Sequence, residues 1–165
     1  MVVAPKDFRD EEYTMPRQML GEAGASIEVA STKAGSAVGT SGTQAPVDLL
    51  ASAAKGGDYD AVIFVGGTGM TAYLNHPDFV RLAKESAAAG KVTAAICVAP
   101  SILANAGVLQ GVEATVWKSE QGVLKAKGAT LSGKDAVRSG KIVTANGPAA
   151  AHQFGLLIIE TLKQK

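Results

Sequence analysis

Residues 92–109 read VTAAICVAPSILANAGVL and decide the fold. The first five residues are apolar and partly β-branched, a pattern typical of a short buried strand. Cys97 follows at once, and the spacing after it predicts a helix over Ala99–Ala106 that stops at Gly107. A buried strand that turns directly into a helix is the repeating unit of a parallel α/β sheet.

The same alternation continues in both directions along the chain. Lys33–Pro46 is rich in Gly, Ser and Thr and is expected to form two weak strands or a flap. A β-hairpin is expected over Asp135–Ala145. The other expected strands are Met1–Ala4, Ser26–Ala30, AVIFV (61–65), VTAAI (92–96) and ATVW (114–117). The expected helices are Glu11–Ala23, Pro77–Gly90, Ala99–Ala106, Ser119–Lys127 and Pro148–Lys163. This pattern predicts a mostly parallel sheet with helices on both faces.

Length and composition restrict the class of protein. The chain has 165 residues, which suits a single domain over 1–165. Lys plus Arg is 16 and Asp plus Glu is 15, so the net charge is +1. That balance argues against a surface that grips nucleic acid or an acidic membrane. The apolar start stops at Pro5 and no apolar run is long enough to cross a bilayer, so we expect a cytoplasmic location.

Two residue counts restrict the chemistry. Cys97 is the one cysteine, which excludes an internal disulfide and a site with several cysteine ligands. The chain has two histidines, His76 and His152, too few for a His-rich metal cage. We therefore expect no metal, and the sequence implies no organic cofactor.

Cys97 is the strongest chemical candidate. A residue at a sharp strand-to-helix turn is presented at the sheet edge, as in a nucleophile elbow. The N-terminus of a helix favours the thiolate, so a lowered thiol pKa is expected. The alternative is that Cys97 is a small buried hydrophobe, which is common for a free cysteine. The local pattern favours the two interpretations equally.

Four segments together resemble the ThiJ/PfpI family, the superfamily of parkinsonism-associated deglycases and intracellular proteases. They are FRDEEYTMP (8–16), DYDAVIFVGGTG (58–69), AAICVAPSILANAGVLQGVEATVW (94–117) and KIVTANGPAAAHQFGLLIIETL (141–162). The resemblance implies a flavodoxin-like three-layer α/β/α sandwich, similar to class I glutamine amidotransferase domains. It also implies a homodimer.

The resemblance assigns roles to particular residues. Cys97 matches the reactive cysteine of the family, and Glu12 matches the acidic partner that approaches the thiol. A carboxyl in that position can hydrogen-bond a thiolate or shuttle a proton. Gly66 and Gly67 match a turn whose N–H groups face the cysteine, and the N–H of Val98 would complete an oxyanion pocket. The alternative for Glu12 is an exposed acid in the first turn of a helix.

The chain also departs from the family pattern. Protease-like members have a histidine directly after the cysteine, where this chain has Val98. Other members have a histidine in the next strand, where this chain has Trp117, which is expected to line the pocket together with Pro148. A tryptophan in the core or at an interface is the alternative. His76 and His152 are expected to be structural or solvated, which leaves Glu12 as the proton carrier.

Three functions remain open from the sequence. The first is an enzyme for small reactive carbonyls, in which Cys97 attacks a substrate such as a 2-oxoaldehyde. The second is a peptidase or amidase, which the absence of an adjacent base weakens. The third is a non-catalytic redox sensor or chaperone-like stress protein, since an exposed low-pKa thiol oxidises readily. The first needs only the residues present and ranks highest.

Overall fold

The computed structural model of the chain describes residues 1–164. The strands are β1 (Lys6–Phe8), β2 (Ala30–Ser31), β3 (Gly35–Gly39), β4 (Gln44–Val47), β5 (Leu49–Leu50), β6 (Ala61–Phe64), β7 (Val92–Ile96), β8 (Glu113–Ala114), β9 (Thr130–Leu131), β10 (Ala136–Ser139) and β11 (Ile142–Ala145). The α-helices are α1 (Asp10–Glu22), α2 (Pro77–Ala88), α3 (Pro100–Asn105), α4 (Gln121–Ala126) and α5 (Ala151–Lys163). Short 3-10 turns are η1 (Gly56–Asp58), η2 (Thr68–Tyr73), η3 (Lys118–Glu120) and η4 (Pro148–Ala150).

The central sheet contains β10, β11, β7 and β6 in that order. β11 is parallel to β7, with Ala145 beside Ile96, and β7 is parallel to β6, with Ala95 beside Phe64. β10 is antiparallel to β11, which confirms the predicted hairpin. The three parallel strands therefore end at one edge of the sheet, where ligands bind in open α/β folds.

The first residues of the chain extend this sheet toward β2 and β5. Val2 makes parallel bridges to Phe64 of β6 and to Ala30 of β2. The strand predicted at Met1–Ala4 is therefore reduced to bridges around Val2. Its pairing is short because the chain leaves the sheet at Pro5, which has no N–H to donate.

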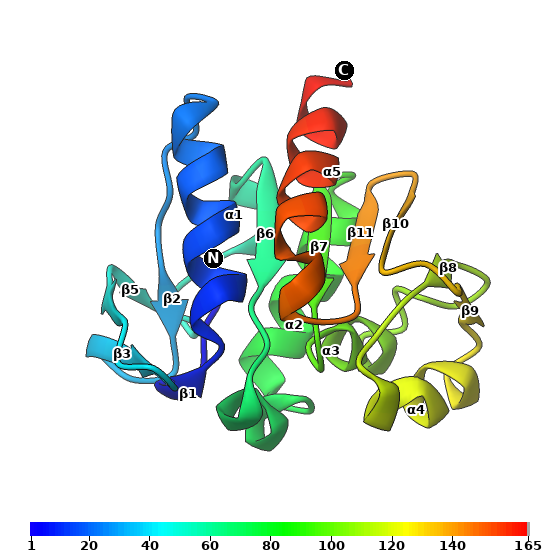
Figure 1. Cartoon of the computed structure of the whole chain (residues 1–165), viewed down its shortest axis with the longest axis horizontal. Helices are drawn as coiled ribbons and strands as arrows, with labels where there is room; N and C mark the ends of the chain where they lie inside the picture. Colours follow the sequence, from blue (N-terminus) through cyan, green and yellow to red (C-terminus); the bar gives the residue numbers. More distant parts are fainter. Residues whose placement is uncertain (165) are drawn as a thin grey trace.

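Helices cover both faces of the sheet (Figure 1). α1 and α5 pack against each other on one face, and α2 and α3 pack together on the other. This arrangement confirms the predicted α/β/α sandwich with a mostly parallel sheet. α2 begins with a proline at its first turn, a residue whose fixed φ suits that position.

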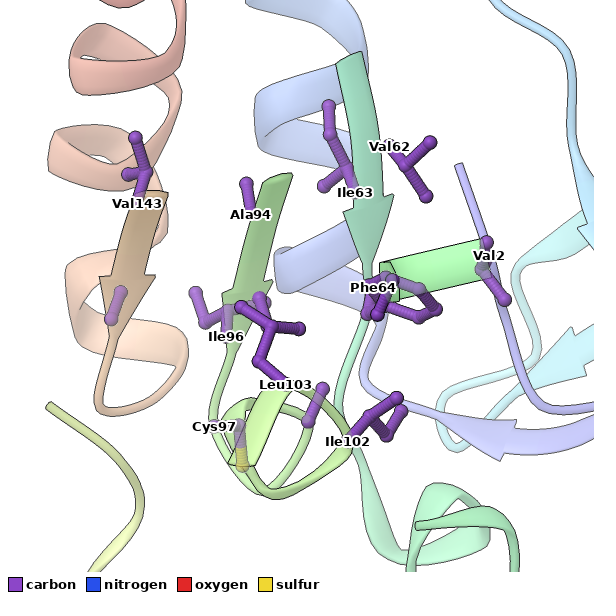
Figure 2. Close-up of a cluster of buried hydrophobic side chains, with 14 of the residues drawn as sticks. Val2, Val62, Ile63, Phe64, Ala94, Ile96, Cys97, Ile102, Leu103 and Val143 are labelled. Atoms are coloured by element: carbon purple, nitrogen blue, oxygen red, sulfur yellow. The ribbon is translucent and has the colours of Figure 1, made fainter. Parts of the chain in front are cut away.

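A continuous apolar core connects the sheet to α3 (Figure 2). Every residue of β7 is buried, which explains why VTAAI has no polar alternation. Ile96, Ile102 and Leu103 have no exposed surface, and Figure 2 shows them close to the end of β7 that carries Cys97. Burying a side chain of this size contributes about 1.5–3 kcal/mol. The cysteine thus follows directly from a fully buried strand.

A second, smaller sheet contains β1, β3 and β4. β3 and β4 are antiparallel, so Lys33–Pro46 contains the two strands that were one of its predicted forms. The Asp10 carboxylate accepts the N–H groups of Ser41 at 2.8 Å and Thr43 at 3.0 Å. These bonds attach the tip of the hairpin to the start of α1.

Two strand predictions were partly wrong. Ser26–Ala30 is assigned as strand only at its end, in β2. The strand predicted at ATVW ends at Ala114, where β8 pairs with β9. Beyond that point the backbone N–H of Trp117 donates to the carbonyl of Cys97 at 2.8 Å, so the chain turns toward the sheet edge before any further pairing.

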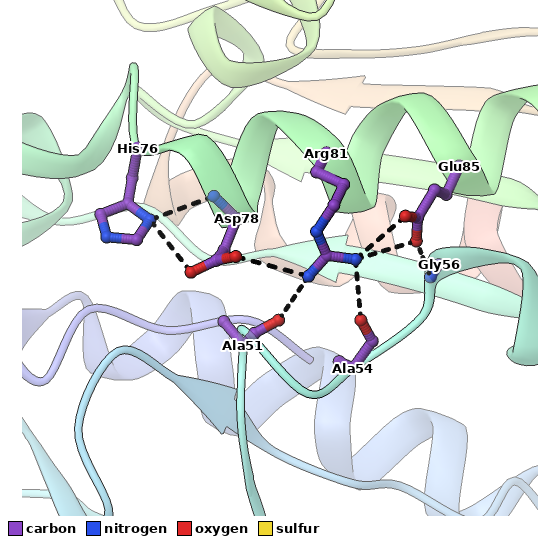
Figure 3. Close-up of polar contacts among 7 residues, drawn as sticks. All are labelled: Ala51, Ala54, Gly56, His76, Asp78, Arg81 and Glu85. Carbon is purple, nitrogen blue, oxygen red and sulfur yellow. Dashed lines mark hydrogen bonds and ion pairs between the residues drawn. The ribbon is translucent and has the colours of Figure 1, made fainter.

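Arg81 attaches the loop before η1 to α2 (Figure 3). Its guanidinium donates to the carbonyl oxygens of Ala51 at 2.8 Å and Ala54 at 2.9 Å, and it pairs with Glu85 at 3.0 Å. Glu85 also accepts the N–H of Gly56 at 2.8 Å. One planar guanidinium thereby holds a loop that has little regular structure of its own.

Within residues 1–164, no helix combines the length and the apolar character that a membrane crossing requires.

Candidate active site

The candidate site lies at the edge where β6 and β7 end. β7 ends at Ile96 and is followed by Cys97, while β6 ends at Phe64 and is followed two residues later by Gly66. The backbone N–H of Cys97 donates to Ala145 at the end of β11, at 2.9 Å. The thiol is therefore held where three parallel strands end.

Cys97 has the strained backbone of an elbow. Its φ is +63°, in the left-handed region that non-glycine residues seldom occupy. The chain then makes turns at Val98 and Ala99 before α3 begins at Pro100. Such strain persists only where the surrounding packing imposes it, and it is found most often at functional sites. Cys97 is buried, with 8% of its surface exposed.

Glu12 lies beside the thiol. It belongs to the first turn of α1 and is completely buried. Its Oε2 accepts the N–H of Gly66 at 3.0 Å. Its Oε1 has no hydrogen-bond partner of good geometry among residues 1–164, and Cys97 is the polar neighbour whose contact lowers the Glu12 pKa. A buried carboxyl oxygen without a partner is costly and rare. Because Glu12 is completely buried, the alternative that it is an exposed acid in the first turn of a helix is excluded.

Gly66 leaves room for the cysteine and the carboxyl to meet. A Cβ at this position would lie 2.5 Å from the Cys97 Cβ and 2.6 Å from Glu12 Oε2. Both groups thus border the same small volume. The glycine is required by space, because any side chain would separate the thiol from the acid.

Gly67 and Gly69 allow two stretches of backbone to cross. Gly67 has a φ of +113°, and a Cβ there would lie 2.6 Å from the carbonyl oxygen of Asp7. A Cβ on Gly69 would overlap the carbonyl oxygen of Lys6. The segment that passes over these glycines leads directly into α1 and so carries Glu12 into the site. The glycines of GGTG are explained by this crossing without any nucleotide.

The two ionisable groups change each other's pKa. Burial raises the pKa of Glu12 to about 7, against the lowering effects of Cys97 and the Gly66 N–H. Burial and the negative charge of Glu12 raise the pKa of Cys97 to about 12, while the N–H groups of Gly67 and Val98 lower it. The prediction that the elbow lowers the thiol pKa is therefore wrong for the thiol beside an ionised Glu12. α3 has only six residues, and its dipole does not offset burial next to a carboxylate.

The pair nevertheless shares one proton between about pH 7 and pH 12. When the proton is on Glu12, the carboxyl is neutral and no longer repels a negative sulfur. The N–H groups of Gly67 and Val98 then face the thiolate. The arrangement can thus supply a thiolate and an acid at the same time.

The remaining candidate residues are Val98, Trp117 and Pro148. Val98 is buried and contributes its backbone N–H. The backbone N–H of Trp117 donates to the carbonyl of Cys97. The Trp117 ring packs on Gly147, where a Cβ would lie 2.8 Å from a ring carbon. Pro148 follows Gly147 and begins η4. A role for Pro148 in lining the pocket remains a prediction.

The histidines lie in structural or solvated positions. His76 precedes α2, and its Nδ1 accepts the N–H of Asp78 at 3.3 Å, as drawn in Figure 3. His152 is exposed on the first turn of α5. Within residues 1–164 neither ring is hydrogen-bonded to Cys97 or Glu12.

Sequence reasoning missed three supporting residues. Asp10 attaches the hairpin to the helix that carries Glu12. Glu120 accepts the Ser101 hydroxyl at 3.1 Å and so attaches the turn after Trp117 to α3. Gly147 has no side chain, so the Trp117 indole can pack against its backbone. The signal for Asp10 was present in the segment FRDEEYTMP (8–16), whereas Glu120 and Gly147 have no local signature.

A cavity lies at the opposite edge of the sheet from the candidate site. It has a volume of about 730 Å³ and is lined at the opposite ends of the strands by residues such as Leu20, Tyr59 and Ile159. None of the candidate site residues lines it. The cavity and the reactive groups thus lie at different edges of the sheet, and the strained thiol and the buried carboxyl mark the candidate site.

A strained cysteine between a parallel strand and a helix places the chain in the class of α/β proteins with a nucleophile elbow. Comparison with known proteins narrows the class. The chain belongs to the DJ-1/PfpI family, whose profile matches residues 1–161.

Individual relatives agree with this assignment. Uncharacterized protein MJ0967 of Methanocaldococcus jannaschii is 37% identical over 99% of this chain and 82% of its own length. Deglycase PYRAB04690 of Pyrococcus abyssi is 33% identical over 70% of this chain and 69% of its own length. The crystal structure of a ThiJ/PfpI domain protein from Brachyspira murdochii superimposes with a TM-score of 0.97 at 32% identity, covering 99% of this chain and 95% of that one.

Proposed function

We propose that this chain is a cofactor-independent cysteine enzyme that acts on small reactive carbonyls, in the manner of a glyoxalase or a deglycase. The observation that carries the proposal is the buried Oε1 of Glu12, which lacks a partner beside the strained Cys97. A carboxyl that holds a proton near neutral pH is suited to general acid–base work. The relative named a deglycase supports the same class of chemistry.

The proposed reaction converts a 2-oxoaldehyde into a 2-hydroxy acid. The Cys97 thiolate forms a C–S bond with the aldehyde carbon, and Glu12 gives its proton to the carbonyl oxygen, which yields a hemithioacetal. Glu12 then moves the hydrogen of that carbon to the neighbouring carbon, while the hydroxyl proton passes between the two oxygens. The product is a thioester. Water hydrolyses it, restores the thiol and releases the hydroxy acid, so the net change is the addition of one water.

The backbone would stabilise the charges in this sequence. The N–H groups of Gly67 and Val98 face the sulfur and are available to an oxyanion on the attacked carbon. Removing one such donor from an enzyme costs about 10²–10³ in kcat. No histidine is needed, because one carboxyl can serve as acid and then as base.

Methylglyoxal turnover tests the proposal. The purified wild-type chain is expected to form lactate, and Cys97→Ser is expected to reduce turnover to background. Glu12→Gln keeps an acceptor for the Gly66 N–H but cannot carry a proton, so kcat should fall by about 10²–10⁴. Wild-type turnover no higher than that of Cys97→Ser would contradict the proposal.

The pH dependence of alkylation locates the shared proton. If the proton stays on Glu12, the thiol is the group of the pair that ionises first, and iodoacetamide should label Cys97 with a midpoint near pH 7. Labelling that rises only toward pH 12 would leave the proton on the sulfur and contradict the mechanism.

Two other functions have distinct outcomes. A peptidase would cleave a panel of fluorogenic peptides in a manner lost in Cys97→Ser, but Val98 supplies no side-chain base for it. A redox sensor would add oxygen to Cys97 at peroxide doses that leave exposed methionines unchanged. The carbonyl enzyme needs neither an added base nor an oxidant.

A further inference from the structure

The indole of Trp117 is the one large aromatic surface that is both exposed and attached to the elbow. The side chain is 46% exposed, more than Met15 and Leu50, the other large exposed hydrophobic residues in the described chain. Its backbone N–H donates to the carbonyl of Cys97 at 2.8 Å. Trp117 is thus held next to the elbow through its backbone, while its side chain is exposed.

The ring of Trp117 packs against the backbone of Gly147. A Cβ on Gly147 would lie 2.8 Å and 2.9 Å from two of its carbons, so the ring lies directly on glycine backbone. Gly147 has a φ of 162°, an extended conformation open to any residue. The absence of a side chain is therefore explained by the ring alone.

The turn that carries the ring is fixed to the elbow helix. The N–H of Glu120 donates to the carbonyl of Trp117 at 2.9 Å. The Glu120 carboxylate accepts the hydroxyl of Ser101, a buried residue of α3, at 3.1 Å. Cys97 and Trp117 are thus attached to the same helix from two sides, which fixes the position of the ring relative to the thiol.

A fixed aromatic ring with exposed surface is suited to recognition. It pays little conformational entropy on binding, and its exposed surface can stack on a flat apolar group. The side chain carries no group that can transfer a proton at neutral pH. Its contribution is therefore binding rather than acid–base chemistry.

We infer that Trp117 is a specificity-determining residue that makes the site prefer carbonyl substrates with a planar ring over aliphatic ones. This inference rests on the proposed function and names the substrate class within it: aryl-substituted 2-oxoaldehydes and their 2-hydroxy acid products. Methylglyoxal presents too little flat surface to gain from the indole.

Turnover of two aldehydes tests the inference. Trp117→Ala should lower kcat/KM for phenylglyoxal by roughly threefold to tenfold, through KM, because one aromatic pair is worth about 0.5–1.5 kcal/mol. Methylglyoxal turnover should change by less than twofold, and Trp117→Phe should retain the preference. Leu50→Ala is the matched control, since Leu50 is 40% exposed on β5. Equal losses for both aldehydes would reveal a structural role and overturn the inference, as would no loss for either.

A binding measurement separates this inference from the proposed function. Trp117 is the one tryptophan in the chain, so fluorescence reports on it alone. In Cys97→Ser, mandelate should quench this fluorescence at concentrations where lactate does not. Similar quenching by both acids, or by neither, would overturn the inference. An inactive wild type that still shows selective quenching would contradict the proposed function and support the aromatic site.

Discussion

At the scale of the residue, the site depends on a glycine at position 66. Gly66 has no Cβ, and the volume that a Cβ would occupy is bordered by the Cys97 Cβ at 2.5 Å and by Glu12 Oε2 at 2.6 Å. The thiol and the acid meet because nothing stands between them. Position 66 therefore controls the pair without taking part in the chemistry.

Gly66→Ala should abolish turnover and destabilise the fold. The added methyl group must displace the thiol or the carboxyl, and overpacking of this kind costs about 1–3 kcal/mol. Gly21→Ala is the matched control, because Gly21 lies in α1 with nothing within 4 Å of the added atom. That variant should be more stable by about 0.5–1 kcal/mol, with unchanged activity. Urea denaturation and methylglyoxal assays measure both effects, and an active Gly66→Ala would disprove the spatial argument.

The identities of the candidate site residues could be predicted from the sequence, whereas the pKa of the thiol could not. The elbow pattern located Cys97, and the family resemblance located Glu12 and the glycine turn. The direction of the thiol pKa could not be predicted, because it depends on how deeply Glu12 is buried and how close it lies. Both quantities are set by the crossing of backbone at Gly67, which brings together segments far apart in the sequence.

At the scale of the element, the fully buried strands were the most predictable. β7 coincides with the predicted VTAAI, since a strand buried on both faces shows no polar alternation, and the hydroxyl of its one polar residue, Thr93, donates to Ser86 at 2.9 Å. β8 was harder to place, because the end of a short strand depends on its partner β9. The turn at Trp117 was missed for a similar reason, since its N–H is taken by Cys97, a residue of another segment.

The loop anchored to α2 supports a prediction at this scale. Arg81 donates to the carbonyls of Ala51 and Ala54 while pairing with Glu85, a fork that an ammonium group cannot reproduce. Arg81→Lys should therefore destabilise the fold by about 1–2 kcal/mol, the worth of one or two hydrogen bonds. Activity should stay within twofold, since the site residues are not involved.

Hydrogen exchange can localise the effect of Arg81→Lys. Faster exchange is expected at the amide of Gly56, which donates to the Glu85 carboxylate that Arg81 holds. Exchange at the Trp117 amide, which is bonded to Cys97, should not change. Equal acceleration at both amides would mean that the loop and the site open as one unit.

At the scale of the whole molecule, the family resemblance predicts a homodimer. The thiol keeps a small exposed fraction, which a partner subunit would help to cover. Light scattering should give about twice the 16.7 kDa mass of the chain. A mass equal to that of one chain at micromolar concentration would contradict this prediction.

The buried acid also makes the stability of the whole fold depend on pH. Burial raises the pKa of Glu12 from 4.5 to about 7. Between these values the folded chain keeps a proton that the unfolded chain has lost, so the free energy of unfolding should fall as the pH rises through this window. The stabilisation is complete below pH 4.5, and its loss by pH 8 amounts to about 3 kcal/mol.

Glu12→Gln isolates this effect, because the amide does not titrate. The buried amine of Met1, whose pKa is lowered to about 6, acts in the opposite direction in both proteins and cancels from the comparison. Urea denaturation at pH 5 and pH 8 should show the variant gaining stability relative to wild type at the higher pH, while its turnover stays low. Identical pH dependence in the two proteins would mean that Glu12 ionises in the folded chain as readily as in water. The carboxyl proton on which the proposed chemistry depends would then be absent near neutral pH. A gain in stability of Glu12→Gln over wild type at pH 8 would instead show that the buried carboxyl costs the wild-type fold free energy when it ionises.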